Sequence, residues 1–464
     1  MINFISILIK LYRLAISPYL PSACKYTPTC SHYFETAMKT HGLLQGLLFF
    51  SNRIIRCNPL ATPTYDPVPN EKIALPTLPS SLMIKTSIIA VILLITVSAT
   101  ACSGRAILPP ASGWGPPVIN NNSLFIITAE GEVRSYDAQN TGELLWSFPD
   151  KNKESKDAYR EKLLGGAYSS PVIEGTTLFV VGYNGKVYAL NTKTGEEIWE
   201  KTFTDKETNF ISGPLITNDQ LLLITTNGTI YSLNLENGKS NRDQSKMKTL
   251  ELQTEIWATP SYKSGIFFIG TTDHQIVAIS SAGEILWKTQ VNGAIVGKPL
   301  IVSVSTGNLI IVGDLDNTIS ALDNNGNIQW QTKTKDWLWA GLIKANKDGT
   351  HIIASDIDGN IYKIKTSNGS IITTTKLDSR IISTPILMED LIVIGGDSGL
   401  LYFLANDSLN EVESPYAVGE SIKSPLVTEN NIIYFTTNGK EKYVLGFDVK
   451  NSKKLWKVST KREN

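Results

Sequence analysis

Apolar and polar residues alternate in a repeating pattern from Trp114 to Trp456. The clearest copy, Ser169 to Trp199, reads SSPVIEGTTLFVVGYNGKVYALNTKTGEEIW. It starts with small residues and a proline, continues with two apolar strands around a glycine turn, and ends in a strand that carries tryptophan. The alternation from Leu178 to Leu190 is split by Asn184-Gly185, which predicts a strand, a tight turn and a strand.

The pattern occurs eight times. Other copies start near Pro116, Gly213, Thr259, Lys298, Ala340, Thr384 and Ser424. The aligned prolines Pro117 and Pro425 lie 308 residues and seven repeats apart, so the period averages 44 residues. A unit of about 40 to 45 residues with several strands has the length of one four-stranded propeller blade. The repeats predict an eight-bladed all-β propeller over residues 105–464.

Tryptophans recur at the end of the repeat, at Trp146, Trp199, Trp287, Trp330 and Trp456. We expect these large flat side chains to fill the wedge between neighbouring blades. Trp337 and Trp339 could stack on a ligand. However, Trp339 shares its position in the repeat with Trp257, so packing is the expected role.

The segment Asp356-Ile357-Asp358-Gly359-Asn360 resembles the beginning of a calcium loop. The remaining ligand spacing and the terminal glutamate are missing. Other repeats have Tyr183-Asn184-Gly185 or Asp316-Asn317 at this position, so a hairpin turn is the favoured interpretation.

The N-terminal residues 2–17 place polar side chains every three or four positions, which predicts a helix with a narrow polar face. Lys10 and Arg13 lie on that face and would be costly in the bilayer centre, so we expect them to contact membrane headgroups. The alternative is a helix packed into a small soluble core.

Three prolines between Ser17 and Cys30 predict a compact loop. A second helix is expected from Ser31 to Cys57, with Ser31 as its N-cap and Glu35 in its first turn. Together these segments predict a small α-helical module over residues 1–69. Residues 70–82 are then a proline-rich linker.

Residues 86–104 form a charge-free apolar run within a predicted signal or anchor segment, residues 83–104. Basic residues lie mainly on its N-terminal side, which places residues 1–69 on the cytoplasmic face and the propeller outside. The junction Ser98-Ala99-Thr100-Ala101-Cys102 has three interpretations: a lipoprotein signal with lipidation of Cys102, an ordinary signal-peptidase site, or an uncleaved anchor. We favour lipidation of Cys102.

Charge is distributed unevenly between the two parts. Residues 1–101 hold eight basic and three acidic residues, a net charge of +5, and the remainder of this neutral chain is therefore −5. The basic part favours membrane lipids as partners, and no nucleic-acid partner is expected.

Three of the four cysteines, Cys24, Cys30 and Cys57, fall within the first 57 residues. They could share a metal with a histidine, but their spacing is unlike that of a zinc knuckle. A disulfide is disfavoured in a reducing cytoplasm, which leaves packing or another thiol chemistry.

The repeats resemble those of the pyrroloquinoline-quinone-type propellers, most specifically in the string from Tyr188 to Trp199, YALNTKTGEEIW. Within that group, the exported lipoprotein form that we expect for this propeller is similar to the BamB family. Members of that family are noncatalytic scaffolds in outer-membrane protein assembly. The resemblance implies no enzyme activity and no cofactor. Quinoprotein dehydrogenases in the group use a quinone with calcium, and their adjacent-cysteine pair is absent.

The N-terminal segments SPYLPSACKYTPTCSHY, HGLLQGLLFFSNRIIRCNP and YDPVP resemble the YidD family of membrane protein insertion efficiency factors. The matching positions include Cys24, Cys30, Arg56, Cys57, Asp66 and Pro67. One departure is Pro63-Thr64, where the family usually has Gly-Gly. Such proteins are peripheral to the cytoplasmic side of the membrane and are thought to assist the insertase.

These features together predict a membrane-associated assembly factor that is not an enzyme. We expect the N-terminal module to assist a membrane protein insertase and the propeller to bind envelope or client proteins. The alternatives are a membrane-tethered quinoprotein oxidoreductase, or a sensor or binding propeller with an incidental N-terminal fusion.

Overall fold

The computed structural model describes residues 26–27, 30–42, 45–46, 49–50, 64–65, 115–139, 141–203, 208–217, 220–240, 249–305 and 307–461. The chain divides into two compact units, Met1–Arg105 and Ala106–Asn464. In the described part of the chain, no helix is both long and apolar enough to cross a membrane. The predicted anchor, residues 83–104, lies outside the described residues.

The larger unit consists of eight four-stranded antiparallel sheets, each made of consecutive strands. The eight-bladed propeller predicted from the repeats is therefore confirmed. Blades 1 to 4 comprise β3 (Val118–Asn120), β4 (Ser123–Ile127), β5 (Val133–Asp137) and β6 (Leu144–Phe148); β7 (Val172–Glu174), β8 (Thr177–Val181), β9 (Lys186–Asn191) and β10 (Glu197–Thr202); β11 (Leu215–Thr217), β12 (Gln220–Ile224), β13 (Thr229–Asn234) and β14 (Leu250–Glu251); and β15 (Ser261–Lys263), β16 (Ile266–Gly270), β17 (Gln275–Ser280) and β18 (Ile285–Gln290).

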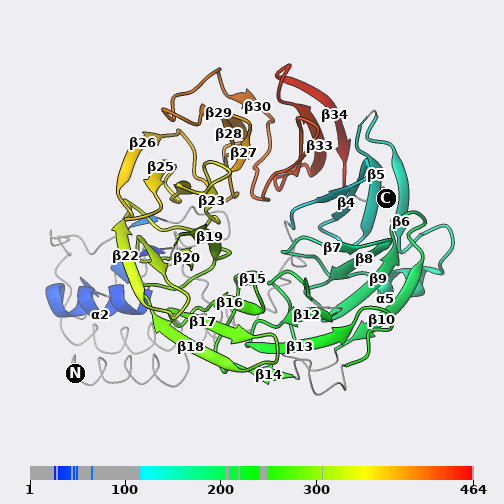
Figure 1. The fold of residues 1–464 in the computed structure, drawn as a ribbon, viewed down its shortest axis with the longest axis horizontal. Coiled ribbons are helices and arrows are strands. Elements are labelled where there is room, and N and C mark those ends of the chain that lie inside the picture. Colours follow the sequence, from blue (N-terminus) through cyan, green and yellow to red (C-terminus); the bar gives the residue numbers. More distant parts are fainter. Residues whose placement is uncertain are drawn as a thin grey trace, which may run out of the picture. The chain divides into compact units, whose positions relative to one another are not determined.

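Blades 5 to 8 comprise β19 (Leu300–Val304), β20 (Gly307–Gly313), β21 (Thr318–Leu322) and β22 (Ile328–Lys333); β23 (Ile343–Lys344), β24 (His351–Ser355), β25 (Asn360–Lys365) and β26 (Ile371–Lys376); β27 (Ile386–Met388), β28 (Leu391–Gly395), β29 (Leu400–Ala405) and β30 (Tyr416–Ala417); and β31 (Val427–Glu429), β32 (Ile432–Thr436), β33 (Tyr443–Asp448) and β34 (Lys453–Ser459). Figure 1 shows the blades following one another around a ring in sequence order, so that red β34 lies next to the cyan first blade.

The hydrophobic core of this unit lies between the blades. The second strand of blade 2, β8, is buried on both faces, whereas the fourth strand β10 is largely exposed. The cluster that contains Leu124 and Ile126 of blade 1 also contains Tyr434 and Val444 of blade 8, so blade faces bury one another across the closure of the ring. Strands buried on both faces read as continuous apolar runs, as the sequence has them.

The predicted wedge role of the tryptophans is also confirmed. Each indole Nε1 donates to a backbone carbonyl of the next blade at 2.8–3.0 Å: Trp146 to Thr192, Trp199 to Leu235, Trp287 to Asn324, Trp330 to Thr366 and Trp456 to Ala138. The last of these bonds joins blade 8 to blade 1 and closes the ring. A register shift in the fourth-strand pairing lies beside each of these tryptophans, for example between Glu197 and Trp199. Such bulges re-aim side chains.

A short helix not expected from the sequence, α5 (Lys156–Lys162), lies in the connection between blades 1 and 2. Ser155 caps it by accepting a hydrogen bond from the Ala158 N–H at 3.3 Å. The buried Tyr159 hydroxyl contacts the Glu132 carboxylate of blade 1, which anchors the helix.

In the N-terminal unit, α2 (Cys30–His41) begins one residue before Ser31, so the expected N-cap at Ser31 is wrong, and Glu35 is not in the first turn. The expected continuous helix to Cys57 is also wrong, because Gly42 follows α2 with a φ of 83° and ends it. The chain then turns back, and Phe50 stacks on Phe34 with ring centroids 4.6 Å apart. The break therefore allows a small core to form.

Candidate functional site

The segments that lead into the first strands of the blades surround a central cavity of about 950 Å³. All eight blades contribute to its wall, through positions such as Pro116, Ser170, Gly213, Thr259, Lys298 and Lys423. Ligand sites in proteins commonly have volumes of about 300 to 1,000 Å³. This cavity is the candidate functional site.

Small residues and prolines in these leading segments allow neighbouring blades to approach each other around the cavity. The Gly213 N–H donates to Thr259 Oγ1 at 3.0 Å, and the Gly341 N–H donates to Thr384 Oγ1 at the same distance. A Cβ on Gly297 would lie 3.1 Å from the Ala340 carbonyl oxygen. Proline suits the start of a strand because the ladder needs no N–H there. The wall is thus held by bonds between blades rather than within one blade.

The charged residues in this wall are three lysines, Lys263, Lys298 and Lys423, and none of the described lining residues is Asp or Glu. Lys423 pairs with Asp397 at 3.7 Å, and the Lys263 ammonium contacts Ser303 Oγ. No described residue forms a hydrogen bond or ion pair with Lys298. The surrounding protein desolvates its ammonium and lowers its pKa below the usual 10.5, although the side chain is exposed to the lumen. The cavity is therefore positive within a unit of net negative charge.

Two indoles also line the cavity. Trp257 and Trp339 lead into blades 4 and 6, and Trp257 remains 38% exposed. Part of the Trp257 ring is therefore available to a ligand. Trp339, for which the sequence favours packing, is half-buried. Trp337 is 47% exposed and lies outside this wall.

A quinone with calcium, as in the quinoprotein dehydrogenases, does not fit this wall. Calcium takes six to eight oxygen ligands, commonly including carboxylates. The described lining offers no Asp, Glu, Asn or Gln side chain, and no described group of three or more His, Cys, Asp or Glu could hold a metal.

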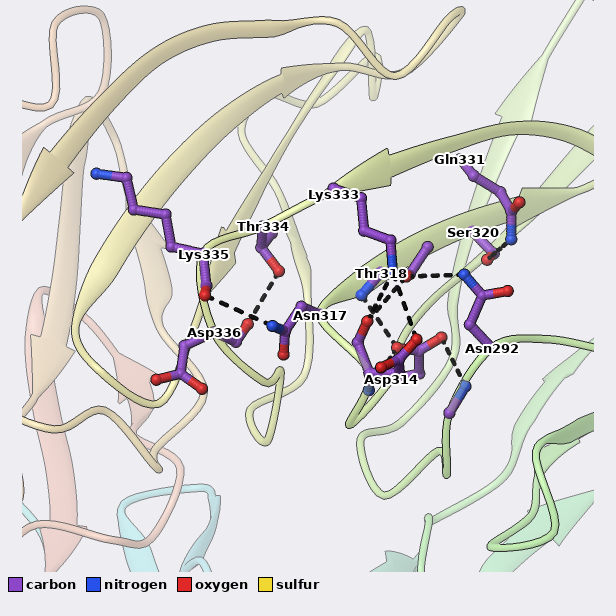
Figure 2. Close-up of polar contacts among 12 residues, drawn as sticks. Asn292, Asp314, Asn317, Thr318, Ser320, Gln331, Lys333, Thr334, Lys335 and Asp336 are labelled. Carbon is purple, nitrogen blue, oxygen red and sulfur yellow. Dashed lines mark hydrogen bonds and ion pairs between the residues drawn. The ribbon is translucent and has the colours of Figure 1, made fainter. Parts of the chain in front are cut away.

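The hairpin interpretation of residues 356–360 is confirmed by its hydrogen bonds. The fully buried Asp356 carboxylate accepts from the Asn360 N–H at 2.9 Å and from the Tyr362 hydroxyl at 2.7 Å. Asp314 plays the same part in blade 5, where its carboxylate accepts from the Thr318 N–H at 3.0 Å. Figure 2 shows Asp314 beside Thr318 in that turn, with the Asn292 side chain reaching Thr318. These aspartates hold turns.

The first of the three N-terminal segments that carry the YidD resemblance meets the start of the third in a short parallel ladder. Strand β1 (Tyr26–Thr27) pairs with β2 (Thr64–Tyr65), with Tyr26 opposite Thr64 and Thr27 opposite Tyr65. Tyr26 and Thr27, which lie between Cys24 and Cys30 in the sequence, are therefore beside Thr64 and Tyr65, which directly precede Asp66 in the sequence. The backbone of Cys30 begins α2. Lys10, Arg13, Cys24, Arg56, Cys57, Asp66, Pro67 and Cys102 lie outside the described residues, and their roles remain predictions.

Two families match this chain. The family described as "Outer membrane protein assembly factor BamB" matches residues 129–242 and 242–457. The family described as "Putative membrane protein insertion efficiency factor" matches residues 1–69. The fusion inferred from the sequence is therefore confirmed.

Curated relatives cover the N-terminal module. The "Putative membrane protein insertion efficiency factor" from Thermotoga sp. (strain RQ2) is 53% identical over 64 residues, 14% of this chain and 79% of its own length. Its counterpart from Francisella tularensis subsp. novicida is 54% identical over 63 residues, 13% of this chain and 77% of its own length.

Solved structures cover the propeller. BamB from Moraxella catarrhalis has a TM-score of 0.56 and 17% identity over 71% of this chain and 94% of its own. The computationally designed Ika8 protein also has a TM-score of 0.56, with 15% identity over 72% of this chain and 96% of its own. At these identities the similarity shows the fold alone.

Proposed function

Since the chain belongs to the BamB family over its propeller and to the insertion efficiency factors over residues 1–69, we propose that it assists two steps of protein assembly at the membrane. Membership of both families supports a broad role in membrane and envelope assembly. In this proposal the propeller is a noncatalytic extracytoplasmic scaffold that binds client or envelope proteins.

The observation that carries the scaffold role is the exposure of the fourth strands. Most of the large apolar side chains that are exposed in the described residues lie on them: Leu144, Leu145, Ile198, Ile285, Leu286, Ile328, Ile371 and Ile372. Each fourth strand stands at the end of its sheet, and no further strand among the described residues pairs with its outer edge. An extended polypeptide can add to such an edge, with backbone bonds supplying affinity and alternate side chains supplying specificity.

The N-terminal module, in the same proposal, lies on the cytoplasmic face and assists a membrane protein insertase. Lys10 and Arg13 would contact anionic lipid headgroups, and the family motif around Cys24, Cys57 and Asp66 would form the family-specific surface. Lipidation of Cys102 would hold the propeller at the opposite face of the membrane.

Site-specific photocrosslinking in cells tests the scaffold role. A photoreactive amino acid replaces Ile372 on β26, and a control carries it at Lys347, an exposed position in a turn of the same blade. We expect unfolded envelope proteins or an envelope-assembly protein to crosslink through position 372 only. If neither class is recovered from position 372, or both positions give the same products, the scaffold role is wrong.

A further inference from the structure

Lys298 occupies a position at which the other repeats carry small residues or proline. Directly before the aligned proline or its substitute, those repeats have Pro116, Ser170, Gly213, Thr259, Gly341, Thr384 and Ser424. The blade architecture therefore needs no long side chain there. The protein nevertheless holds an ammonium in the cavity wall at a cost in desolvation, with no anionic partner among the described residues.

Lys263 connects the cavity to a second hollow. It lines both the central cavity and a groove of about 510 Å³ between blades 4 and 5. The groove is bordered by Leu286, which is 47% exposed, and by the side chains of Asn308, Asn324 and Asn325. Because both hollows have Lys263 in their walls they are neighbours, and we refer to the two together as the path. Leu286, on the outer strand of blade 4, borders the second hollow.

The chemistry of the path changes along its length. The lumen offers a lysine without a described partner and the indoles of Trp257 and Trp339, whereas the groove offers amides and several apolar side chains. An amide side chain both donates and accepts hydrogen bonds, as a peptide backbone does. Neither hollow is lined by a described carboxylate, so an anionic ligand meets no repulsion from its walls.

We propose that the cavity and this groove together bind an extended client segment that carries a carboxylate, with Lys298 as its counterion. The extent of the path over two neighbouring hollows and the amides that line the groove favour a polypeptide over a compact small anion. This inference rests on the proposed scaffold function and names the class of ligand that one of its surfaces takes.

Fluorescence anisotropy with the full-length protein tests the proposal. The probe is a labelled ten-residue peptide of alternating Val and Thr with two central aspartates, and a matched peptide carries two asparagines instead. Lys298→Gln should weaken binding of the aspartate peptide by about tenfold, as expected for loss of a charge partner in the cavity wall. Lys347→Gln, at an exposed lysine in a turn of blade 6, serves as control and should leave the affinity unchanged.

Three results would overturn the assignment: equal affinity for the two peptides, unchanged affinity in Lys298→Gln, or displacement of the peptide by N-acetylaspartate at concentrations as low as those of unlabelled peptide. The last would mean a small-anion site. Crosslinking through position 372 separates this proposal from the scaffold role, because persistent crosslinks in a protein that fails these binding tests leave the scaffold role intact.

Discussion

Lys363 of blade 6 donates from its Nζ to the Asn406 carbonyl of blade 7 at 2.7 Å. At five other blade boundaries the corresponding donor is a tryptophan indole, as in the bond from Trp330 to Thr366. Lys363 pairs across the sheet with Thr373, which occupies the tryptophan position. The hydrogen bond is therefore retained at this boundary although the indole is missing.

The same boundary also replaces the glycine that normally faces the indole. Gly369 has a φ of 71°, and a Cβ there would lie 2.4 Å from the Trp330 ring. Leu409 occupies the corresponding turn position in blade 7 with a φ of 59°, and it is fully buried in the cluster shared with blade 6. At this boundary the Leu409 side chain, from the later blade, thus fills the space that a tryptophan from the earlier blade fills at the other boundaries.

Replacing Lys363 with methionine should lower the free energy of unfolding by about 1–2 kcal/mol. The Asn406 carbonyl loses a charged donor, and an unmade bond at a partly buried site costs about that much. Lys365→Met on the same strand is the control, since Lys365 is exposed. Urea unfolding measures both variants. Equal effects of the two substitutions would contradict a role for this bond.

Gly142→Ala should destabilise the propeller more than Gly175→Ala does. Both glycines have positive φ values, 64° and 56°, so alanine is strained at either position by roughly 1 kcal/mol. Only at Gly142 would the new Cβ meet an indole, at 2.6 Å from Trp456 at the ring closure, whereas nothing lies within 4 Å at Gly175. Overpacking should add about 1–3 kcal/mol to the effect at Gly142.

Chemical denaturation of the two alanine variants provides this comparison, because the shared backbone strain cancels between them. A similar loss of stability at both positions would mean that the contact with Trp456 contributes little to ring closure.

The blade number follows from the sequence because the strand pattern is repeated eight times. The role of the tryptophans follows because the residue recurs at the same repeat position five times. The exchange of Trp for Lys363 and Leu409 is not visible in the same way. It involves residues on two blades that lie 46 positions apart, and each alone is only a departure from the repeat. The helix break at Gly42 was missed because the apolar pattern continues beyond it.

The cavity was missed for a related reason. Trp257 and Trp339 share a position in the repeat, and recurrence alone indicates packing, so only the closed ring reveals that both face a lumen. The available signal was Lys298, a long charged side chain at a position otherwise held by small residues or proline. Of the motif positions in residues 1–69, Cys24, Arg56, Cys57, Asp66 and Pro67 lie outside the described residues, so their roles stay predictions.

Lys298→Met should make the propeller more stable at neutral pH, and the difference should shrink as the pH approaches 10.5. Desolvation lowers the pKa of Lys298 in the folded protein. At pH values between that lowered pKa and 10.5, Lys298 therefore binds more protons in the unfolded state than in the folded state. The stability of the unmodified protein then rises with pH relative to the variant. Thermal unfolding at pH 7 to 10.5 measures this, with Lys288→Met as control. A difference independent of pH would reflect packing of methionine instead.

Replacing both Lys10 and Arg13 with glutamate should release the protein from anionic vesicles. Each basic residue near such a surface contributes about 1 kcal/mol, so reversing two charges should weaken binding by roughly 2 kcal/mol or more. The control reverses Lys25 and Lys72, with the same change in net charge. Sedimentation with phosphatidylserine vesicles measures the bound fraction of each double variant. Equal loss in both would indicate a nonspecific charge effect rather than a membrane-facing helix.

Processing at Cys102 decides whether the two modules remain in one polypeptide. Small residues precede it, and Met83, Lys85 and the apolar run resemble an independent lipoprotein signal, so we expect cleavage before Cys102 and lipidation of its thiol. Multiple acyl chains anchor a protein stably without a spanning helix. A fatty-acid probe in cells should therefore label a propeller fragment that starts at Cys102, and Cys102→Ser should abolish the label. An unlabelled fragment would indicate simple secretion, whereas a full-length membrane species of 464 residues would show that one polypeptide joins the two modules.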